Sequence, residues 1–253
     1  SHTGAMASPD TAVEALFRKA GIVRCNSRSE LIEVASVFTR PALKGKRIAI
    51  ITHAGGPAVM LTDALSKGGM EVPQITGKKA DALREKLFPG SSVANPIDFL
   101  ATGNAEHLGY IIDSCENDFD NIDAMAVIFG SPGLFPVYDV YDLLDKKMRT
   151  CSKPIFPVLP SIINVSQEIK EFLSKGNINF PDEVPFANAL CKVSDTQYRE
   201  VAEYEQYTID KTTIRTIIDS SENGYLSPED VSRLLKAAGI PLAEEAVVTN
   251  SAE

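Results

Sequence analysis

Short continuous runs of apolar residues alternate with helical patterns along most of this chain. Runs at 48–51, 124–129 and 154–159 are apolar throughout, which is typical of strands buried on both faces of a parallel sheet. Shorter runs lie at 70–72 and 178–180. Between these runs, apolar positions at helical spacing predict helices at about 58–67, 79–87, 104–115, 137–148 and 165–175. The sequence therefore predicts an α/β fold, a flavodoxin-like parallel five-stranded sheet with helices on both faces.

Both ends of the chain have a different pattern, with helices and little strand signal. Ser8 and Pro9 are typical of a helix start, and Gly21 of its end. A short strand is predicted at 22–23, followed by a helix that Ser27 or Ser29 caps. After residue 180 the pattern predicts helices only, and the clearest begins with Ser227, Pro228 and Asp230 and ends at Gly239. We therefore expect helical N-terminal and C-terminal segments around the sheet.

Charge and composition exclude several classes of protein. A formal net charge of -9 argues against a nucleic-acid groove and against a surface that binds anionic lipid. No apolar run approaches the ~20 residues that span a bilayer, and the N-terminus does not resemble a signal peptide. We therefore expect a cytoplasmic protein that binds neither nucleic acid nor membrane. The four cysteines form no CxxC pair, so we expect buried small side chains and no metal site.

Two loops that follow predicted strands contain residues suited to binding anions. The candidates for a phosphate cradle are Gly55 and Gly56 in the first loop and Gly130, Ser131 and Gly133 in the second. Glycines allow close approach to the backbone, and free amides at a helix N-terminus favour phosphate. Neither loop matches a Walker A or GxGxxG pattern, and each could equally be a tight turn from strand to helix. Pro132 lacks an amide hydrogen, which reduces the donors of the second loop.

Each of the three histidines suggests a different role. His2 lies among small residues before a helix, where its imidazole could carry a phosphoryl group, although residues 1–7 could also be a remnant of expression. His53 follows the first sheet strand, at the edge where open α/β sheets bind ligands, and is a possible site-lining residue. His107 lies inside a predicted amphipathic helix, and we interpret it as a solvated or packed helix residue.

Several segments resemble the NDP-forming acyl-CoA synthetases, which include ADP-forming acetate–CoA ligases and are relatives of succinyl-CoA synthetase. The segment Ser1–Ala5 with the following helix resembles the phosphohistidine segment of that family. The stretches 47–52, 54–57 and 95–98 resemble its next domain, and 226–241 resembles the start of its ATP-grasp domain. Because the matching pieces occur in the family's order, the resemblance favours His2 as the phosphoryl carrier.

The resemblance implies an arrangement of domains. Residues 1–43 would end the first ligase (phosphohistidine) domain, 44–192 would form a ligase-like flavodoxin-type domain, 193–223 a helical connector, and 224–253 the start of the ATP-grasp domain. CoA-binding and ATP-grasp domains would lie in the same chain or in a partner subunit, in an oligomer. The complete enzyme would use a small carboxylic acid, CoA, ATP or ADP, and Mg²⁺. We expect the 253-residue chain alone to bind no cofactor and to be inactive as an acid–thiol ligase.

Two alternatives differ in function class. One is a regulatory module of the same domain set, fused to a protein acetyltransferase; the histidine is often absent there, so His2 favours the ligase. The other is a non-catalytic flavodoxin-like binding domain, which the histidine segment and the ATP-grasp start argue against.

Overall fold

Four parallel strands form the centre of the larger of two units. They are β1 (Ile48–Thr52), β2 (Ile97–Asp98), β3 (Ala124–Ile128) and β4 (Ile155–Val158), in the spatial order β2-β1-β3-β4. The computed structural model describes residues 10–131, 137–160, 165–196 and 208–243. The chain divides into units at residues 1–199 and 200–253, and each is considered by itself.

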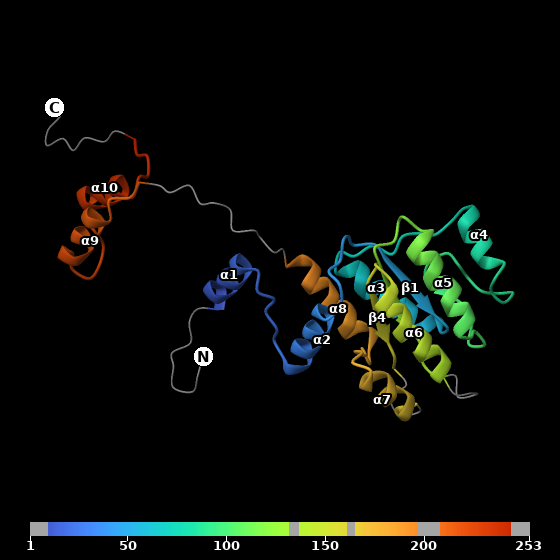
Figure 1. Ribbon diagram of the computed structural model, residues 1–253. Helices are drawn as coiled ribbons and strands as arrows, with labels where there is room; N and C mark the ends of the chain where they lie inside the picture. Colours follow the sequence, from blue (N-terminus) through green and yellow to red (C-terminus); the bar gives the residue numbers. More distant parts are fainter. Residues whose placement is uncertain (1–9, 132–136, 161–164, 197–207, 244–253) are drawn as a thin grey trace. The chain divides into compact units, whose positions relative to one another are not determined.

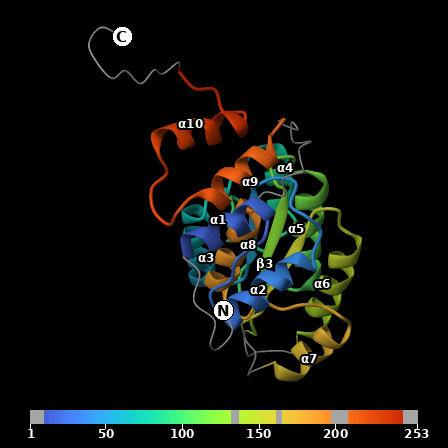
Figure 2. The same ribbon diagram turned by 90° about the vertical axis from the view of Figure 1, so that its left-hand side faces the viewer.

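Helices cover both faces of this sheet. Alternate side chains of β1 enter two separate cores, with Ala49 and Ile51 in one and Ile48 and Ile50 in the other. The first core is closed by α4 (Lys78–Arg84), α5 (Ala105–Asn117), α6 (Tyr138–Thr150) and α7 (Ser166–Ser174). The second is closed by α2 (Arg28–Phe38), α3 (Gly55–Lys67) and α8 (Glu183–Asp195). Figures 1 and 2 show α5 and α6 on one side of the strands and α3 on the other. The predicted flavodoxin-like α/β class is therefore confirmed.

The prediction of five strands is wrong, because two short apolar runs each make only one bridge. Phe180 pairs with Val158, but Pro181 follows it without an amide hydrogen. Glu71 pairs with Arg47, and Pro73 ends that pairing in the same way. The two-residue strand β2 has no apolar run to reveal it. The strand predicted at 22–23 does not form.

The outer side of β1 is completed by three different pieces of chain. The Ile48 amide donates to the Glu71 carbonyl (2.8 Å) at one end, and the Phe99 amide donates to the Thr52 carbonyl (3.0 Å) at the other. Between them the side chain of Asn95 accepts from the Ile50 amide (2.9 Å) and donates to the Ile48 carbonyl (3.0 Å). An amide side chain thus replaces the backbone of a missing strand residue.

An ion pair between Arg47 and Asp123 stabilises the amino-terminal edge of the sheet. Asp123 accepts from the Arg47 amide (2.9 Å), from Nε (2.9 Å) and from the guanidinium NH2 group (2.7 Å). Hydrogen bonding to Arg47, opposed by burial, holds the pKa of Asp123 below its ordinary value. A Cβ on Gly45 would meet the Asp123 carboxylate at 2.2 Å, so glycine leaves room for this ion pair. This edge is therefore organised for stability.

The remaining helices are α1 (Asp10–Ala20), α9 (Lys211–Ser220) and α10 (Pro228–Ala237). Ser8 and Pro9 lie outside the described residues, and Gly21 ends α1 with a φ of 68°. In the smaller unit, α9 packs on α10, and the Asp210 amide donates to the Ala237 carbonyl (2.9 Å). Ser227 caps α10 by accepting from the Asp230 amide, which confirms the predicted helix start.

Candidate functional site

The carboxyl edge of β1, β2 and β3 brings together most of the predicted site residues that the structure describes. Thr52 pairs with Asp98 of β2 on one side and with Ile128 of β3 on the other. The residues that follow these three strands are therefore neighbours at one edge. This is the edge at which open α/β sheets bind ligands.

The helix α3 begins at this edge without a side-chain cap. Its N-cap is Ala54, in an extended conformation, and Gly55 and Gly56 are its first two residues. The helix therefore starts earlier than the predicted start at about residue 58. Thr52 Oγ1 donates to the Ala54 carbonyl (2.8 Å) and accepts from the Ala54 amide (3.0 Å), which fixes the approach to the helix. The first amides of α3 thus carry the positive end of a helix dipole with no capping side chain over them.

The turn into α3 does not require its glycines. Neither Gly55 nor Gly56 has a φ between +20° and +160°, the region that favours glycine. A Cβ on Gly56 would meet no heavy atom within 4 Å, and one on Gly55 would meet only Asp98 Oδ2, at 3.9 Å. Two glycines at the start of a helix disfavour it compared with alanine. The open space above them is therefore suited to a ligand that approaches the backbone closely.

His53 packs into the same edge. Its ring lies 4.6 Å from the ring of Phe129, centroid to centroid, and its Nδ1 atom is buried with no hydrogen-bond partner among the described residues. Burial lowers the pKa of His53 below its ordinary value, while the backbone of Ile128 and the carboxylate of Asp98 act in the opposite direction. We infer a neutral imidazole at neutral pH, beside the start of α3.

The second predicted loop is only partly described. Gly130 is buried and Ser131 half-buried directly after β3, next to β1, whereas Pro132 and Gly133 lie outside the described residues. The helix that follows, α6, begins at Tyr138, so Gly130 and Ser131 are not in its first turn. Their role in binding phosphate stays a prediction.

Of the other two histidines, only His107 lies among the described residues. His107 is buried in α5 and meets the ring of Phe88 edge to face at 4.4 Å, which agrees with its interpretation as a packed helix residue. His2 lies outside the described residues, so its role stays a prediction. Sequence reasoning missed Asp98, although it was part of the stretch 95–98 that carried the family resemblance. Its position beside Gly55 depends on the pairing of β1 with β2, which no local pattern reveals.

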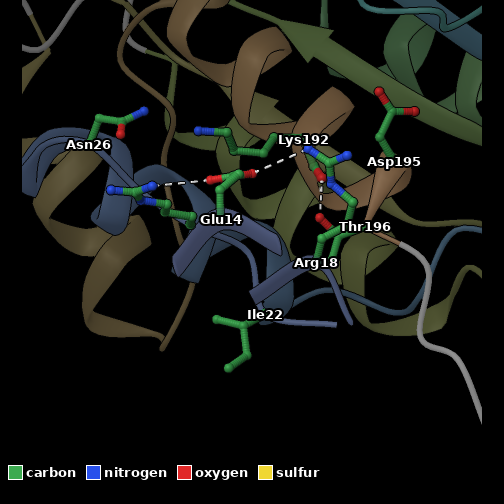
Figure 3. A pocket seen from close by; sticks show the side chains of 8 residues that line it. Glu14, Arg18, Ile22, Asn26, Lys192, Asp195 and Thr196 are labelled. Atoms are coloured by element: carbon green, nitrogen blue, oxygen red, sulfur yellow. Dashed lines mark hydrogen bonds and ion pairs between the residues drawn. The ribbon is translucent and has the colours of Figure 1, made fainter. Parts of the chain in front are cut away.

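A cavity of about 600 Å³ lies elsewhere, between α1 and the end of α8 (Figure 3). Its charged side chains pair with one another or with near neighbours: Arg24 with Glu14 (3.2 Å), Arg18 with Glu14 (3.7 Å), and Lys192 with Glu30. The cations here are engaged by carboxylates, so this cavity is less suited to phosphate than the start of α3.

The described residues contain no group of three or more His, Cys, Asp and Glu side chains that could hold a metal ion. They also contain no helix that is both long and apolar enough to cross a membrane.

Comparison with known proteins relates the chain to one family. A model described as the succinyl-CoA ligase like flavodoxin domain matches residues 1–38. The alpha subunit of acetate–CoA ligase [ADP-forming] II from Pyrococcus furiosus is 31% identical over 182 residues, 70% of this chain and 39% of that protein. The 4-hydroxybutyrate–CoA ligase [ADP-forming] of Nitrosopumilus maritimus is 25% identical over all of this chain and 37% of that protein. The chain thus spans under two fifths of the length of both relatives.

Solved structures agree on the fold. Acetyl-coenzyme A synthetase 1 (dinucleotide forming) of Candidatus Korarchaeum cryptofilum, in complex with phosphate and ADP, superposes with a TM-score of 0.68 over 77% of this chain and 42% of that chain, at 18% identity. A protein from Pyrococcus horikoshii OT3 gives a TM-score of 0.66 over 75% of this chain and 45% of that chain, at 24% identity. At these identities the likeness supports the fold alone.

Proposed function

Because this chain is related to the NDP-forming acyl-CoA synthetases, we propose that it is part of such an enzyme and contributes a phosphate-handling site. The complete enzyme interconverts acyl-CoA, ADP and phosphate with a carboxylic acid, CoA and ATP. Phosphate first displaces CoA to give an acyl phosphate. His2 then takes the phosphoryl group and releases the carboxylate, and the phosphohistidine passes the group to ADP. In this proposal CoA, the nucleotide and Mg²⁺ are bound by the CoA-binding and ATP-grasp domains.

The start of α3 carries this proposal. Its first two residues are exposed glycines that the turn does not require, and no side chain caps this helix start at the carboxyl edge of the sheet. In this proposal the amides of Gly55 and Gly56 donate hydrogen bonds to the phosphoryl group, and the helix dipole favours its negative charge. The neutral ring of His53 lines the site, and Gly130, Ser131 and Gly133 provide the second side of the cradle.

The partners of the chain follow from the same relationship. We propose that CoA-binding and ATP-grasp domains complete the enzyme, in the same chain or in a partner subunit, and that the assembly is an oligomer. Two relatives are named as alpha subunits, which supports a division between chains. We therefore expect no thioester formation when the 253-residue chain is mixed with acid, CoA, ATP and Mg²⁺.

Labelling of the complete enzyme tests the proposed function. After incubation with ATP labelled at the γ-phosphate and Mg²⁺, the protein should carry a label that is lost in acid, as expected of phosphohistidine. His2→Ala should abolish the label, whereas the matched control His107→Gln should keep it. A His2→Ala enzyme that still takes up acid-labile label would contradict the assignment of the carrier.

A further inference from the structure

A second cavity, of about 560 Å³, lies at the amino-terminal edge of the sheet, opposite the edge where phosphate is proposed to bind. It is formed by the ends of α2 and α8, which lie side by side (Figure 1), and by the segment 40–46 that leads into β1. Its volume falls in the range of about 300–1,000 Å³ that small-molecule sites occupy. This amino-edge cavity is therefore large enough for a small organic ligand.

One wall of the amino-edge cavity is apolar. Val37 and Phe156 belong to the second core, and Leu43 and Val193 pack against that core. Phe38 also lines the cavity, and it is 61% exposed. Because covering apolar surface is favourable, this wall suits a ligand with an apolar body.

The charged residues that line the amino-edge cavity are all cations, namely Arg40, Lys44 and Lys46. Lys46 is paired with Asp195 (3.0 Å), whereas Lys44 is exposed and forms no ion pair within the described residues. No aspartate or glutamate of the described chain lines the cavity. It differs in this from the cavity beside α1, whose cations are engaged by carboxylates, and it is therefore suited to an anion.

Arg40 is the cation of this cavity that most needs a counter-charge. Its guanidinium is half-buried, its Nη2 donates to the Met148 carbonyl (2.7 Å), and its Nε is buried without a hydrogen-bond partner. No carboxylate of the described chain pairs with it. Burial and the nearby charge of Arg149 lower the pKa of Arg40 below its ordinary value. An arginine stays protonated in proteins, and buried charges are normally paired, so a bound anion would supply what the chain does not.

We propose that the amino-edge cavity binds an organic carboxylate, whose carboxylate group pairs with Arg40 and whose apolar body covers Leu43 and Val193. The planar guanidinium matches the geometry of a carboxylate, and Lys44 adds attraction from the rim. Inorganic phosphate would leave the apolar wall uncovered, and an apolar cation would leave Arg40 without a counter-charge. The site is separate from the start of α3 and does not depend on the proposed function.

Calorimetric titration of the 253-residue chain tests this site, with 4-phenylbutyrate as the probe. Three compounds are its controls: acetate has the carboxylate without the apolar body, 4-phenylbutylamine has the body with the opposite charge, and inorganic phosphate has charge without the body. We expect 4-phenylbutyrate to bind at least about tenfold more tightly than acetate or the amine, a difference of ~1.4 kcal/mol. Equal binding of acetate or of the amine overturns the proposal.

Substitution of Arg40 locates the binding. Arg40→Gln should weaken the affinity for 4-phenylbutyrate at least about tenfold, because hydrogen bonds to a charged group are lost. Arg40→Lys should recover part of the affinity, because it keeps the charge without the planar donors. Phosphate should bind equally to the wild type and to Arg40→Gln, since any phosphate site at the start of α3 is unaffected. Phosphate binding that depends on Arg40 and equals that of 4-phenylbutyrate would overturn the assignment to an organic acid.

A second variant keeps the test decisive if Arg40→Gln unfolds through loss of its bond to Met148. Lys44→Gln changes an exposed side chain and should weaken the affinity for 4-phenylbutyrate by about two- to fivefold, as expected for a charge at the rim. Its matched control is Lys78→Gln, which removes an exposed lysine from the start of α4 on the other face of the sheet and should bind as the wild type does. Wild-type affinity in a folded Arg40→Gln overturns the proposal. If that variant is unfolded, wild-type affinity in Lys44→Gln overturns it instead.

Discussion

The helices α3 and α5 follow neighbouring strands of one sheet, yet their first turns are built differently. α5 begins after Asn104, whose side chain accepts from the His107 amide (3.0 Å), whereas α3 begins after Ala54 and has no capping side chain. A capping side chain in place of alanine typically stabilises a helix by about 0.5–2 kcal/mol. The chain therefore uses a cap at α5 and forgoes one at α3. In the proposed function, the α5 terminus serves the fold, whereas the uncapped α3 terminus binds the phosphoryl group.

The largest effect on phosphohistidine formation should come from giving α3 a capping side chain, which α5 already has. Ala54→Asp adds a carboxylate at an extended N-cap position, where it can accept from the free amides of α3. We expect the free energy of unfolding to rise by about 1 kcal/mol. Phosphohistidine formation in the complete enzyme should fall at least ~100-fold, because repulsion between charges at about 4 Å near a protein surface amounts to ~4 kcal/mol. A stabilised variant that is labelled at the wild-type rate would show that these amides do not meet the phosphoryl group.

A smaller effect should follow when a side chain covers the amides without adding charge. Gly56→Val introduces a Cβ that meets nothing within 4 Å, so the melting temperature should change little. The bulk should lower phosphohistidine formation by at least about tenfold, equivalent to ~1.4 kcal/mol.

Gly176→Ala is the matched control for this variant. Gly176 has a φ of +84°, so a side chain there should cost about 1 kcal/mol of stability while the labelling rate stays the same. If Gly56→Val unfolds the protein, the glycine is structural. If a folded Gly56→Val is phosphorylated normally, the cradle lies elsewhere, and Gly130 to Gly133 become the first candidates.

The opposite outcome is expected when the cap of α5 is removed. Asn104→Ala leaves the His107 amide without its acceptor, and the free energy of unfolding should fall by about 1 kcal/mol. The labelling rate should not change at temperatures where the variant is folded. Chemical denaturation measures the free energy of unfolding, and single-turnover labelling measures the rate of phosphohistidine formation. A reduced rate in folded Asn104→Ala would mean that the α5 terminus also supports the site, which would remove the contrast with α3.

The smallest effect concerns the residue that leads into α3. Burial lowers the pKa of His53 below its ordinary value of 6.5, so the unfolded chain binds this proton more readily than the folded chain. Acidification below about pH 6.5 should therefore favour unfolding, and this contribution should be absent above about pH 7. Compared with His53→Gln, the wild type should lose stability between pH 7 and pH 5. Parallel stability curves for the two proteins over this range would contradict the burial of a neutral ring.

Strands with a full apolar run could be predicted from the sequence, whereas long-range pairing could not. The runs at 48–51, 124–129 and 154–159 correspond to β1, β3 and β4, since burial on both faces demands apolar residues throughout. β2 was missed because two residues after a proline carry no periodicity. The glycines of the first loop were located correctly at the sheet edge. Their conformation was not, because Gly-Gly suggests a turn and only the surrounding structure places both residues inside a helix.

At two places beside the sheet, an asparagine side chain bonds to backbone groups that no full strand pairs. Asn95 pairs with the backbone of Ile48 and Ile50 beside β1, and Asn179 accepts from the Leu159 amide (3.0 Å) and donates to its carbonyl (3.2 Å) beyond β4. An exposed row of unpaired amides and carbonyls can add an extended segment from another molecule, which leads to aggregation. A side-chain amide satisfies the local backbone groups but offers no further row of its own to continue the ladder. The two asparagines therefore leave fewer free backbone groups beside a strongly apolar parallel sheet, where an extended segment of another molecule could otherwise pair.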